Sequence, residues 1–253
     1  MSRLGADGLL LTTAVLWGVT FVAQKYATAT MPALAFVAAR FAVSAAALAP
    51  FALWEFRRKP HAPSRDEWRL ALVIGLTLFF GTTLQQAGIE TTSATNAGFL
   101  TACYVVLTPF VVWTLTGAPP RAIVVAAGLV SLVGAWLLAF VQYTVCAGLA
   151  AVGSAFLEST PPGALIATAP TILFAGIISG ALAYTIQIFA QAHTPPAEAA
   201  LILALEGVFA ALAGALLLSE RLTAIGALGC VLIMAGAVVV EIGPLFGQKA
   251  ASA

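Results

Sequence analysis

The stretch AQAHTPPAEAALILALEGVFAALAGALLLSERLTAIGALGCVLIMAGAVVVE, residues 190–241, repeats an earlier part of the same chain. It aligns without a gap with residues 88–139 at an offset of 102, which places Thr194 on Thr92. Many membrane transporters are built by duplicating an apolar unit of several helices. The repeat therefore predicts a membrane protein made of two related sets of helices.

The composition excludes a soluble protein. Hydrophobic residues make up 61% of the 253 residues, charged residues make up 8%, and the mean hydropathy is +1.03, whereas a soluble domain has about 25% charged residues. The net charge of +1 gives no sign of a nucleic-acid partner, so the lipid bilayer is the expected partner. Cys103, Cys146 and Cys230 lie in apolar runs without metal-binding or redox spacing, so we expect core residues and neither a metal nor another cofactor.

Apolar runs separated by prolines mark the membrane spans. A helix needs about 20 apolar residues to cross the hydrocarbon core, and lipid offers the backbone no other hydrogen-bond partner. Proline pairs at 119–120, 161–162 and 195–196 punctuate the loops. The expected spans are 8–25, 32–54, 69–88, 95–115, 122–157, 167–190, 197–218 and 224–242.

The distribution of Lys and Arg indicates the orientation of the chain in the membrane. The loop at 55–69 contains five cations, so we expect it in the cytoplasm together with the N-terminus. With the C-terminus on the same side, eight of the eleven cations are cytoplasmic, and only Lys25 and Arg221 face outward. The sequence therefore predicts a multi-pass protein of a bacterial-type inner membrane.

The run at 122–157 is too long for one ordinary span. It contains 36 residues without a charge or a proline, and as one helix it would measure about 54 Å against a hydrocarbon core of about 30 Å. Its first half matches the last span of a repeat, whereas residues 139–158 resemble the second span at 35–55. The chain thus divides into a first repeat at 1–139 with five spans and a second repeat at 139–253 that lacks its first span.

Two arrangements of this long run fit the sequence, with about eight or nine spans in total. One long or kinked helix would give eight crossings and place both termini in the cytoplasm, which the distribution of cations favours. A hairpin near Gln142-Tyr143-Thr144 would give nine crossings and place Lys249 outside.

Five short motifs occur in order along the chain. They are LWGVTFV at 16–22, AARF at 38–41, TSATNAGF at 92–99, ALEGVFAA at 204–211 and LSERLT at 218–223. Together, at this spacing, they resemble the EamA-type branch of the drug/metabolite transporter superfamily. The resemblance covers nearly all of residues 8–242, although Gly207 stands where the family usually has a proline.

The resemblance implies ten helices in two inverted halves, with alternating access around a central cavity. It implies export or exchange of small polar metabolites, such as amino acids or related solutes, often coupled to protons. The chain departs from the family in lacking most of the sixth helix, which would help to line the cavity.

Two charged residues lie within expected spans. Arg40 and Glu206 each lie about nine residues into a span, where a charge costs at least about 2.5–3.5 kcal/mol and should face the interior of the bundle. In the functional interpretation, Glu206 exchanges a proton, while Arg40 holds an anionic group of the substrate or modulates that exchange. In the structural interpretation, the two form a pair, or backbone carbonyls satisfy Arg40.

Uncharged polar residues within the spans form a second group of candidates. Gln85 and Gln187 occupy equivalent repeat positions, which suits a cavity at the interface between repeats. The alternative is hydrogen bonding between helices, worth about 0.6 kcal/mol each. Trp17 either lines the cavity or packs between helices. The full set of candidates for a substrate or ion pathway is Glu206, Arg40, Gln85, Gln187, Tyr184, Tyr104, Asn96 and Trp17.

Residues near the ends of the spans are expected to have structural roles. Glu158 and Glu198 lie near the membrane interfaces and are expected to be solvated, and Glu220 is expected to pair with Arg221 at little energetic value. The sequence GIISG at 176–180 has the spacing that lets helices approach closely, either within the bundle or in a homodimer.

The sequence contains no arrangement typical of an enzyme. It has no nucleophile with a neighbouring base, no metal-binding His-Glu-x-x-His motif and no glycine-rich phosphate loop, so no catalytic residue is expected. The favoured function is a secondary transporter that exports small polar metabolites by alternating access, with proton coupling. The alternatives are a channel or a flippase for lipid-linked substrates of the same fold, and a non-functional, internally deleted transporter.

Overall fold

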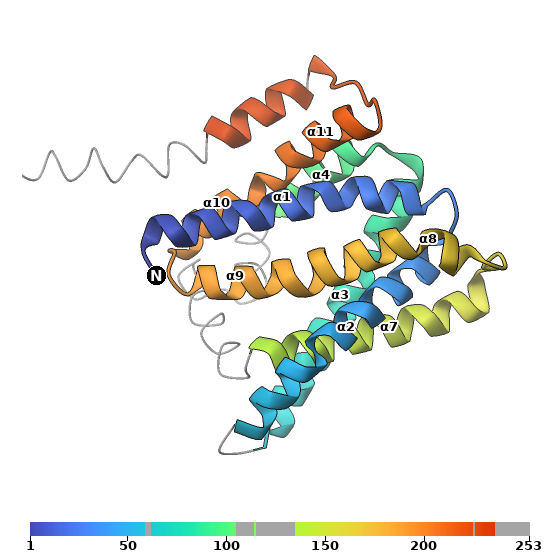
Figure 1. Ribbon diagram of the computed structural model, residues 1–253, viewed down its shortest axis with the longest axis vertical. Helices are drawn as coiled ribbons and strands as arrows, with labels where there is room; N and C mark the ends of the chain where they lie inside the picture. Colours follow the sequence, from blue (N-terminus) through green and yellow to red (C-terminus); the bar gives the residue numbers. More distant parts are fainter. Residues whose placement is uncertain (59–61, 105–113, 115–134, 225, 236–253) are drawn as a thin grey trace, which may run out of the picture. The chain divides into compact units, whose positions relative to one another are not determined.

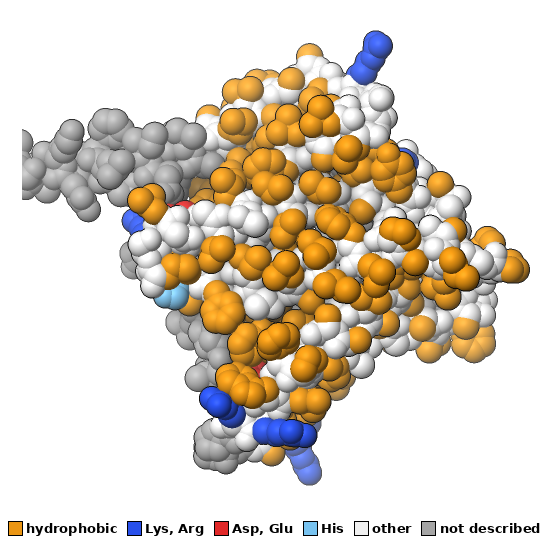
Figure 2. All heavy atoms as spheres, viewed as in Figure 1, with side chains coloured by type: hydrophobic (Ala, Val, Ile, Leu, Met, Phe, Trp, Pro, Cys, Tyr) orange, Lys and Arg blue, Asp and Glu red, His pale blue; other side chains and the backbone are white. Residues whose placement is uncertain are grey.

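The computed structural model describes residues 1–58, 62–104, 114, 135–224 and 226–235 (Figure 1). Every regular element in these residues is a helix. Among the described residues, six helices are long and apolar enough to cross a membrane, and a shorter apolar helix follows at Gly226–Ala235. Hydrophobic side chains cover much of the face shown in Figure 2, as contact with lipid requires. The prediction of an all-α membrane fold is confirmed.

The helices follow the expected spans closely, with a few internal breaks. In chain order they are α1 (Arg3–Ala27), α2 (Ala33–Arg58), α3 (Arg65–Thr91), α4 (Ala94–Ala102), α7 (Ala135–Leu157), α8 (Ala164–Leu173), η1 (Phe174–Ala183), α9 (Tyr184–Gln191), α10 (Pro196–Ala204) and α11 (Glu206–Leu217). Of these, α8, η1 and α9 form one continuous apolar helix with a π-helical middle.

The described part of the long apolar run is one uninterrupted helix, α7, although the sequence also allowed a hairpin there. Helix α7 continues through Gln142, Tyr143 and Thr144, so the hairpin near these residues is wrong. The physical reason is that Tyr143 packs in the core against Phe41 of α2, at 5.1 Å between ring centroids, instead of turning the chain. The preceding part of the run, residues 122–134, lies outside the described residues.

The helices form two compact units, and neither coincides with a sequence repeat. Unit 1 consists of Met1–Val22, Ser93–Ala118 and Ile186–Ala253, and unit 2 consists of Ala23–Thr92 and Pro119–Thr185. Each unit therefore combines segments of both repeats. The division of the chain near residue 139 stays a prediction about the sequence repeats.

In unit 2, α2 and α7 are antiparallel, and each caps the other. Glu55, near the end of α2, accepts a hydrogen bond of 2.8 Å from the backbone amide of Leu137. Glu158, just after α7, accepts bonds of 2.8 and 2.9 Å from the amides of Leu34 and Ala35. Because α7 is the repeat equivalent of α2, this arrangement is the one that inverted repeats produce. Glu158 is not simply solvated as expected, because the free amides of a helix N-terminus attract a carboxylate.

The π-helical segment η1 packs tightly against α2 through its two glycines. A Cβ at Gly176 would lie 2.8 Å from the carbonyl oxygen of Arg40, and one at Gly180 would lie 2.2 Å from the Ser44 hydroxyl oxygen. The Ser44 hydroxyl donates to the Gly176 carbonyl at 2.9 Å, and the Tyr143 hydroxyl donates to the Gly180 carbonyl at 3.2 Å. Neighbouring helices therefore partner carbonyls of the π-helical segment. The glycine spacing serves packing within the bundle, one of the two expected alternatives.

In unit 1, α1 and α10 begin side by side. Arg3 forms an ion pair with Glu198, and the Thr194 hydroxyl donates to the Asp7 carboxylate at 2.9 Å. Glu198 is therefore paired instead of simply solvated, because Arg3 at the start of the neighbouring helix reaches its carboxylate.

Helix α11 packs against α1 and α4 at positions where glycine lets the backbones approach. A Cβ at Gly18 in α1 would lie 2.8 Å from the carbonyl oxygen of Glu206. A Cβ at Gly98 in α4 would lie 2.4 Å from the Cβ of Ala210. Both contacts lie in the first half of α11, so α1 and α4 approach this part of the helix closely.

We expect Gly98→Ala to destabilise the protein by about 1–3 kcal/mol, because the added methyl group forces α4 and α11 apart. Gly148→Ala in α7 is the matched control, because a Cβ there would have no atom within 4 Å. The control should be neutral or stabilising by up to about 1 kcal/mol. The measurement is the thermal midpoint of the purified protein in detergent, and equal midpoints for the two variants would contradict the tight contact.

Glu220 caps the N-terminus of α4 instead of pairing with Arg221. Its carboxylate accepts hydrogen bonds from the backbone amides of Ala94 at 2.8 Å and Thr95 at 3.0 Å, and from the Thr95 hydroxyl at 2.6 Å. Ser219, with a left-handed φ of 56°, separates this residue from α11. The expected loop pair is wrong because three oriented donors at a helix N-terminus outweigh one exposed guanidinium.

Glu220→Gln should lower the free energy of unfolding by about 1–3 kcal/mol, because a neutral amide accepts these hydrogen bonds less strongly than a carboxylate. Glu90→Gln is the control, since Glu90 is exposed and its carboxylate has no hydrogen bond among the described residues. Thermal midpoints in detergent test both variants. If the thermal midpoint of Glu220→Gln falls no further than that of Glu90→Gln, the cap contributes nothing to stability.

Candidate functional site

Two helices of unit 1 have a one-residue break at equivalent positions of the two repeats. Helix α4 ends at Ala102 with Cys103 as its C-cap, and α10 ends at Ala204 with Leu205 as its C-cap. Cys103 and Leu205 differ by the repeat offset of 102. Leu205 keeps a right-handed helical conformation, with φ −60° and ψ −12°, and Glu198–Leu217 forms one apolar helix, so this break is a local irregularity within a span.

A carboxyl group and a phenol follow these two breaks. Glu206 is the first residue of α11, and Tyr104 occupies the equivalent repeat position. Glu206 is 3% exposed, and its Oε1 has no hydrogen-bond partner among the described residues. Tyr104 lies close enough to Glu206 for an electrostatic interaction. A buried carboxyl group that is not held by a structural bond can gain and lose a proton at little structural cost, so Glu206 is the candidate proton site.

The other candidates of unit 1 lie in different surroundings. Trp17 packs against an apolar cluster that includes Leu10 of α1 and Leu203 of α10. Asn96 is exposed in the first turn of α4, where its backbone amide donates to the Ser93 hydroxyl at 3.0 Å. Gln187 in α9 is half-buried, and its Oε1 has no partner among the described residues.

Arg40 is the buried charge of unit 2. It is 7% exposed, and its guanidinium carbon lies 4.7 Å from the ring centroid of Phe41 and 5.7 Å from that of Phe36. It interacts electrostatically with Tyr143 and Cys146 of α7. Its Nε is buried without a partner, and its guanidinium forms no ion pair with an acid in the part of the chain that the structure describes. Among the described residues, the charge is thus stabilised by the aromatic faces of Phe36 and Phe41 and by Tyr143 and Cys146, without an acid.

A connected set of polar side chains extends from Arg40. Tyr143 contacts Tyr184 edge-on at 5.9 Å between ring centroids, and the Gln142 side chain lies close enough to Tyr184 for a polar interaction. The Cys146 sulfur lies 3.6 Å from the Thr82 hydroxyl oxygen. The structure therefore brings the predicted Tyr184 together with Arg40 through Tyr143. Sequence reasoning missed Tyr143 and Gln142 as site residues, although both are polar residues within a run without charges.

Gln86 is more deeply buried in unit 2 than its predicted neighbour Gln85. Gln86 is fully buried, and its Nε2 donates to the Gln24 carbonyl at 3.3 Å. The side-chain carbonyl oxygens of Gln86 and Gln24 have no partner among the described residues. Gln85 is half-buried and has a partner. Gln24 was missed because it lies at the end of an expected span, next to Lys25.

The arrangement offers candidate binding groups and a candidate proton site, and it offers no metal site in the described residues. No group of three potential metal ligands among His, Cys, Asp and Glu occurs in them. A buried guanidinium beside tyrosines can hold an anionic group, and a buried carboxyl group can carry a proton. These two sites lie in different units, Arg40 in unit 2 and Glu206 in unit 1.

Comparison with known proteins shows what the chain is similar to. The EamA-like transporter family matches residues 4–140 and again 137–242. An uncharacterized transporter of Archaeoglobus fulgidus is 29% identical over 281 residues, covering 96% of this chain and 87% of the relative. The aligned stretch is longer than this chain of 253 residues, so the relative contains aligned residues that this chain lacks. No solved structure matches the chain.

Proposed function

Because the chain belongs to the EamA-like transporter family and is a membrane transporter, we propose that it is a secondary transporter that exports small polar metabolites. The substrate carries an anionic group, as amino acids do. Transport proceeds by alternating access and is coupled to protons. The protein lies in a bacterial-type inner membrane with its N-terminus in the cytoplasm.

The observation that carries this proposal is the surroundings of Arg40. A guanidinium within a span costs at least about 2.5–3.5 kcal/mol, so such residues are rare and usually functional. Phe41 and Phe36 orient this guanidinium, yet its donors have no acid to bind among the described residues. A carboxylate of the substrate would supply the missing acceptor and form two parallel hydrogen bonds with the guanidinium.

Glu206 supports the coupling to protons. Its carboxyl group is buried immediately after a helix break, and Tyr104 approaches it from the equivalent position of the other repeat. In the proposed mechanism the carboxyl group is protonated from one side of the membrane and deprotonated toward the other. The proton gradient then drives export against a concentration gradient of the substrate.

Counterflow in proteoliposomes tests this proposal. Vesicles are preloaded with an unlabelled mixture of amino acids and diluted into a trace of the radiolabelled mixture. A carrier accumulates the label transiently, because internal solute is exchanged for external label, whereas a channel only lets the label equilibrate. We expect a transient overshoot. Equilibration without an overshoot would instead support the channel alternative.

The length difference from the relative favours a second candidate function, a non-functional, internally deleted transporter. The relative has residues within the alignment that this chain lacks, and a lost span would remove part of a cavity wall. The same vesicles separate the two candidates, since an inactive protein gives neither overshoot nor equilibration although it remains folded. A homodimer also stays a prediction, which light scattering of the purified protein tests.

A further inference from the structure

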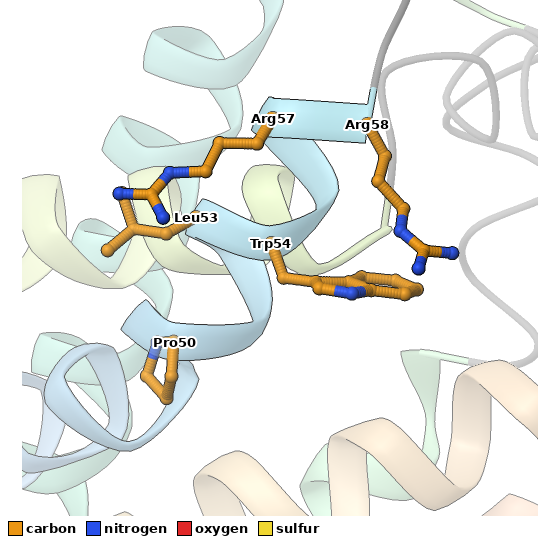
Figure 3. Close-up of a pocket in the computed structure, with 5 residues that line it drawn as sticks. All are labelled: Pro50, Leu53, Trp54, Arg57 and Arg58. Atoms are coloured by element: carbon orange, nitrogen blue, oxygen red, sulfur yellow. The ribbon is translucent and has the colours of Figure 1, made fainter.

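An open groove of about 500 Å³ lies at the end of α2 in unit 2. It is lined by Pro50, Leu53, Trp54, Arg57 and Arg58 (Figure 3). Because Leu53 and Trp54 lie three and four residues after Pro50, and Arg57 and Arg58 lie three and four residues after Trp54, these side chains form one stripe along the helix. Figure 3 shows the Arg58 side chain beside the Trp54 ring, and its guanidinium carbon lies 4.4 Å from the ring centroid. The groove thus combines an aromatic face with two cations.

The aromatic face of the groove is held in place from α7. Trp136 contacts Trp54 edge-on, with 5.9 Å between ring centroids and 68° between ring planes. Trp136 also contacts Phe51, one turn earlier in α2, at 5.7 Å. Trp54 is therefore fixed before anything binds, and Arg58 is already stacked on it. Binding an anion here costs little side-chain entropy.

The two arginines carry charge that no described acid neutralises. Neither Arg57 nor Arg58 forms an ion pair in the described part of the chain. The acids nearest in sequence are engaged elsewhere, since Glu55 accepts a backbone amide of α7 and Asp66 pairs with Arg69. In Figure 2, Lys and Arg side chains gather at the same end of the molecule as the close of α2. Both guanidinium groups are therefore available to an external anion.

The groove crosses the boundary between apolar and charged surface. Phe51, Leu53 and Phe56 are 51%, 54% and 42% exposed, as expected of side chains that face acyl chains. The helix rises about 12 Å between Pro50 and Arg58, which is enough to reach from the acyl chains into the headgroup region. The cation-rich loop that follows α2 places this end at the cytoplasmic leaflet, where anionic lipids are concentrated.

From these contacts we infer that the groove binds the headgroup phosphate of an anionic phospholipid of the cytoplasmic leaflet. Arg58 donates hydrogen bonds to the phosphate oxygens, and Arg57, whose side chain lies on the Leu53 side of the stripe in Figure 3, adds electrostatic attraction for the anionic headgroup. Trp54, Pro50 and Leu53 contact the glycerol and the upper part of the acyl chains. This site is separate from the proposed transport function and does not depend on the identity of the substrate.

Native mass spectrometry of the purified full-length protein tests the site, with phosphatidylglycerol and phosphatidylcholine as the two lipids titrated. Each arginine near a membrane surface should contribute about a five-fold preference for the anionic lipid, and the pair about 25-fold. The double variant Arg57→Gln/Arg58→Gln should lose this preference. Arg57→Lys/Arg58→Lys should keep part of it, because charge remains while the planar, stacked donors are lost.

The matched control is Arg65→Gln/Arg69→Gln, which removes the same charge from the neighbouring start of α3. The control should change the lipid preference less than about two-fold, since its arginines lie outside the groove. Equal losses in the two double variants would overturn the site, because they would show a general effect of loop charge. Equal binding of both lipids by the unaltered protein would overturn it as well, as would full competition by soluble glycerol phosphate, which would indicate a site for free phosphate.

Discussion

Glu206→Gln is expected to reduce uptake driven by a pH gradient about 100-fold or more in proteoliposomes, because an amide cannot carry the proton. Substrate exchange without a gradient should continue, since exchange moves no net proton. The carboxyl group is buried, and no hydrogen bond within the described residues fixes its Oε1, so the neutral amide should fit the same space. Gradient-driven uptake and counterflow of the labelled amino-acid mixture, measured side by side, separate coupling from transport.

Glu198→Gln provides the control for this prediction. Glu198 lies in the preceding helix segment and pairs with Arg3, so its loss removes an acid of the same kind away from the helix break. Uptake driven by the gradient should stay within about two-fold of that of the unaltered protein, because a surface ion pair is usually worth less than about 1 kcal/mol. Intact coupling in Glu206→Gln would remove Glu206 from the mechanism.

Arg40→Met should weaken substrate binding and leave the protein equally stable or more stable. Losing a hydrogen bond from a charged donor costs about 1.5–3 kcal/mol, which corresponds to an increase in KM of about 10- to 100-fold. On the stability side, the cost of a charge within the membrane, at least about 2.5–3.5 kcal/mol, exceeds the roughly 1–2 kcal/mol gained from aromatic stacking. The concentration dependence of exchange and the thermal midpoint in detergent test the two effects.

Arg40→Lys separates the role of charge from the role of shape. Lysine keeps the charge but loses the planar fork and its stacking on Phe41, so we expect a KM between those of the unaltered protein and Arg40→Met. A lower thermal midpoint for Arg40→Met together with unchanged exchange would contradict the binding role. That result would make Arg40 a structural residue.

The spans and the inverted repeats could be predicted because the membrane leaves few choices. An apolar run of about 20 residues must be helical in lipid, and a repeat offset identifies equivalent helices. The same offset of 102 also places Glu206 opposite Tyr104. Comparing every polar position at this offset, beyond Gln85 and Gln187, would have indicated that pair from the sequence.

The partners of the interfacial acids could not be predicted because they are distant in the sequence. Glu220 has Arg221 beside it, yet its carboxylate binds the start of α4. The contact between Arg40 and Tyr143 could not be predicted for a similar reason. Tyr143 belongs to a continuously apolar run, and the hydropathy of such a run does not indicate which face of the helix packs against its neighbours. Which side chains meet is decided by packing between helices, and hydropathy carries little of that information.

The mutual capping of α2 and α7 has a consequence for the order of biosynthesis. The amide of Leu34 binds a carboxylate 124 residues further along the chain, and Glu55 binds an amide 82 residues away. When α2 leaves the ribosome, the residues that cap it have not yet been translated. The helix must therefore enter the bilayer before α7 exists, with its polar end groups not yet capped by Glu158 and Leu137. Assembly of unit 2 can finish only after translation has passed residue 158, so nascent chains truncated earlier carry an uncapped α2.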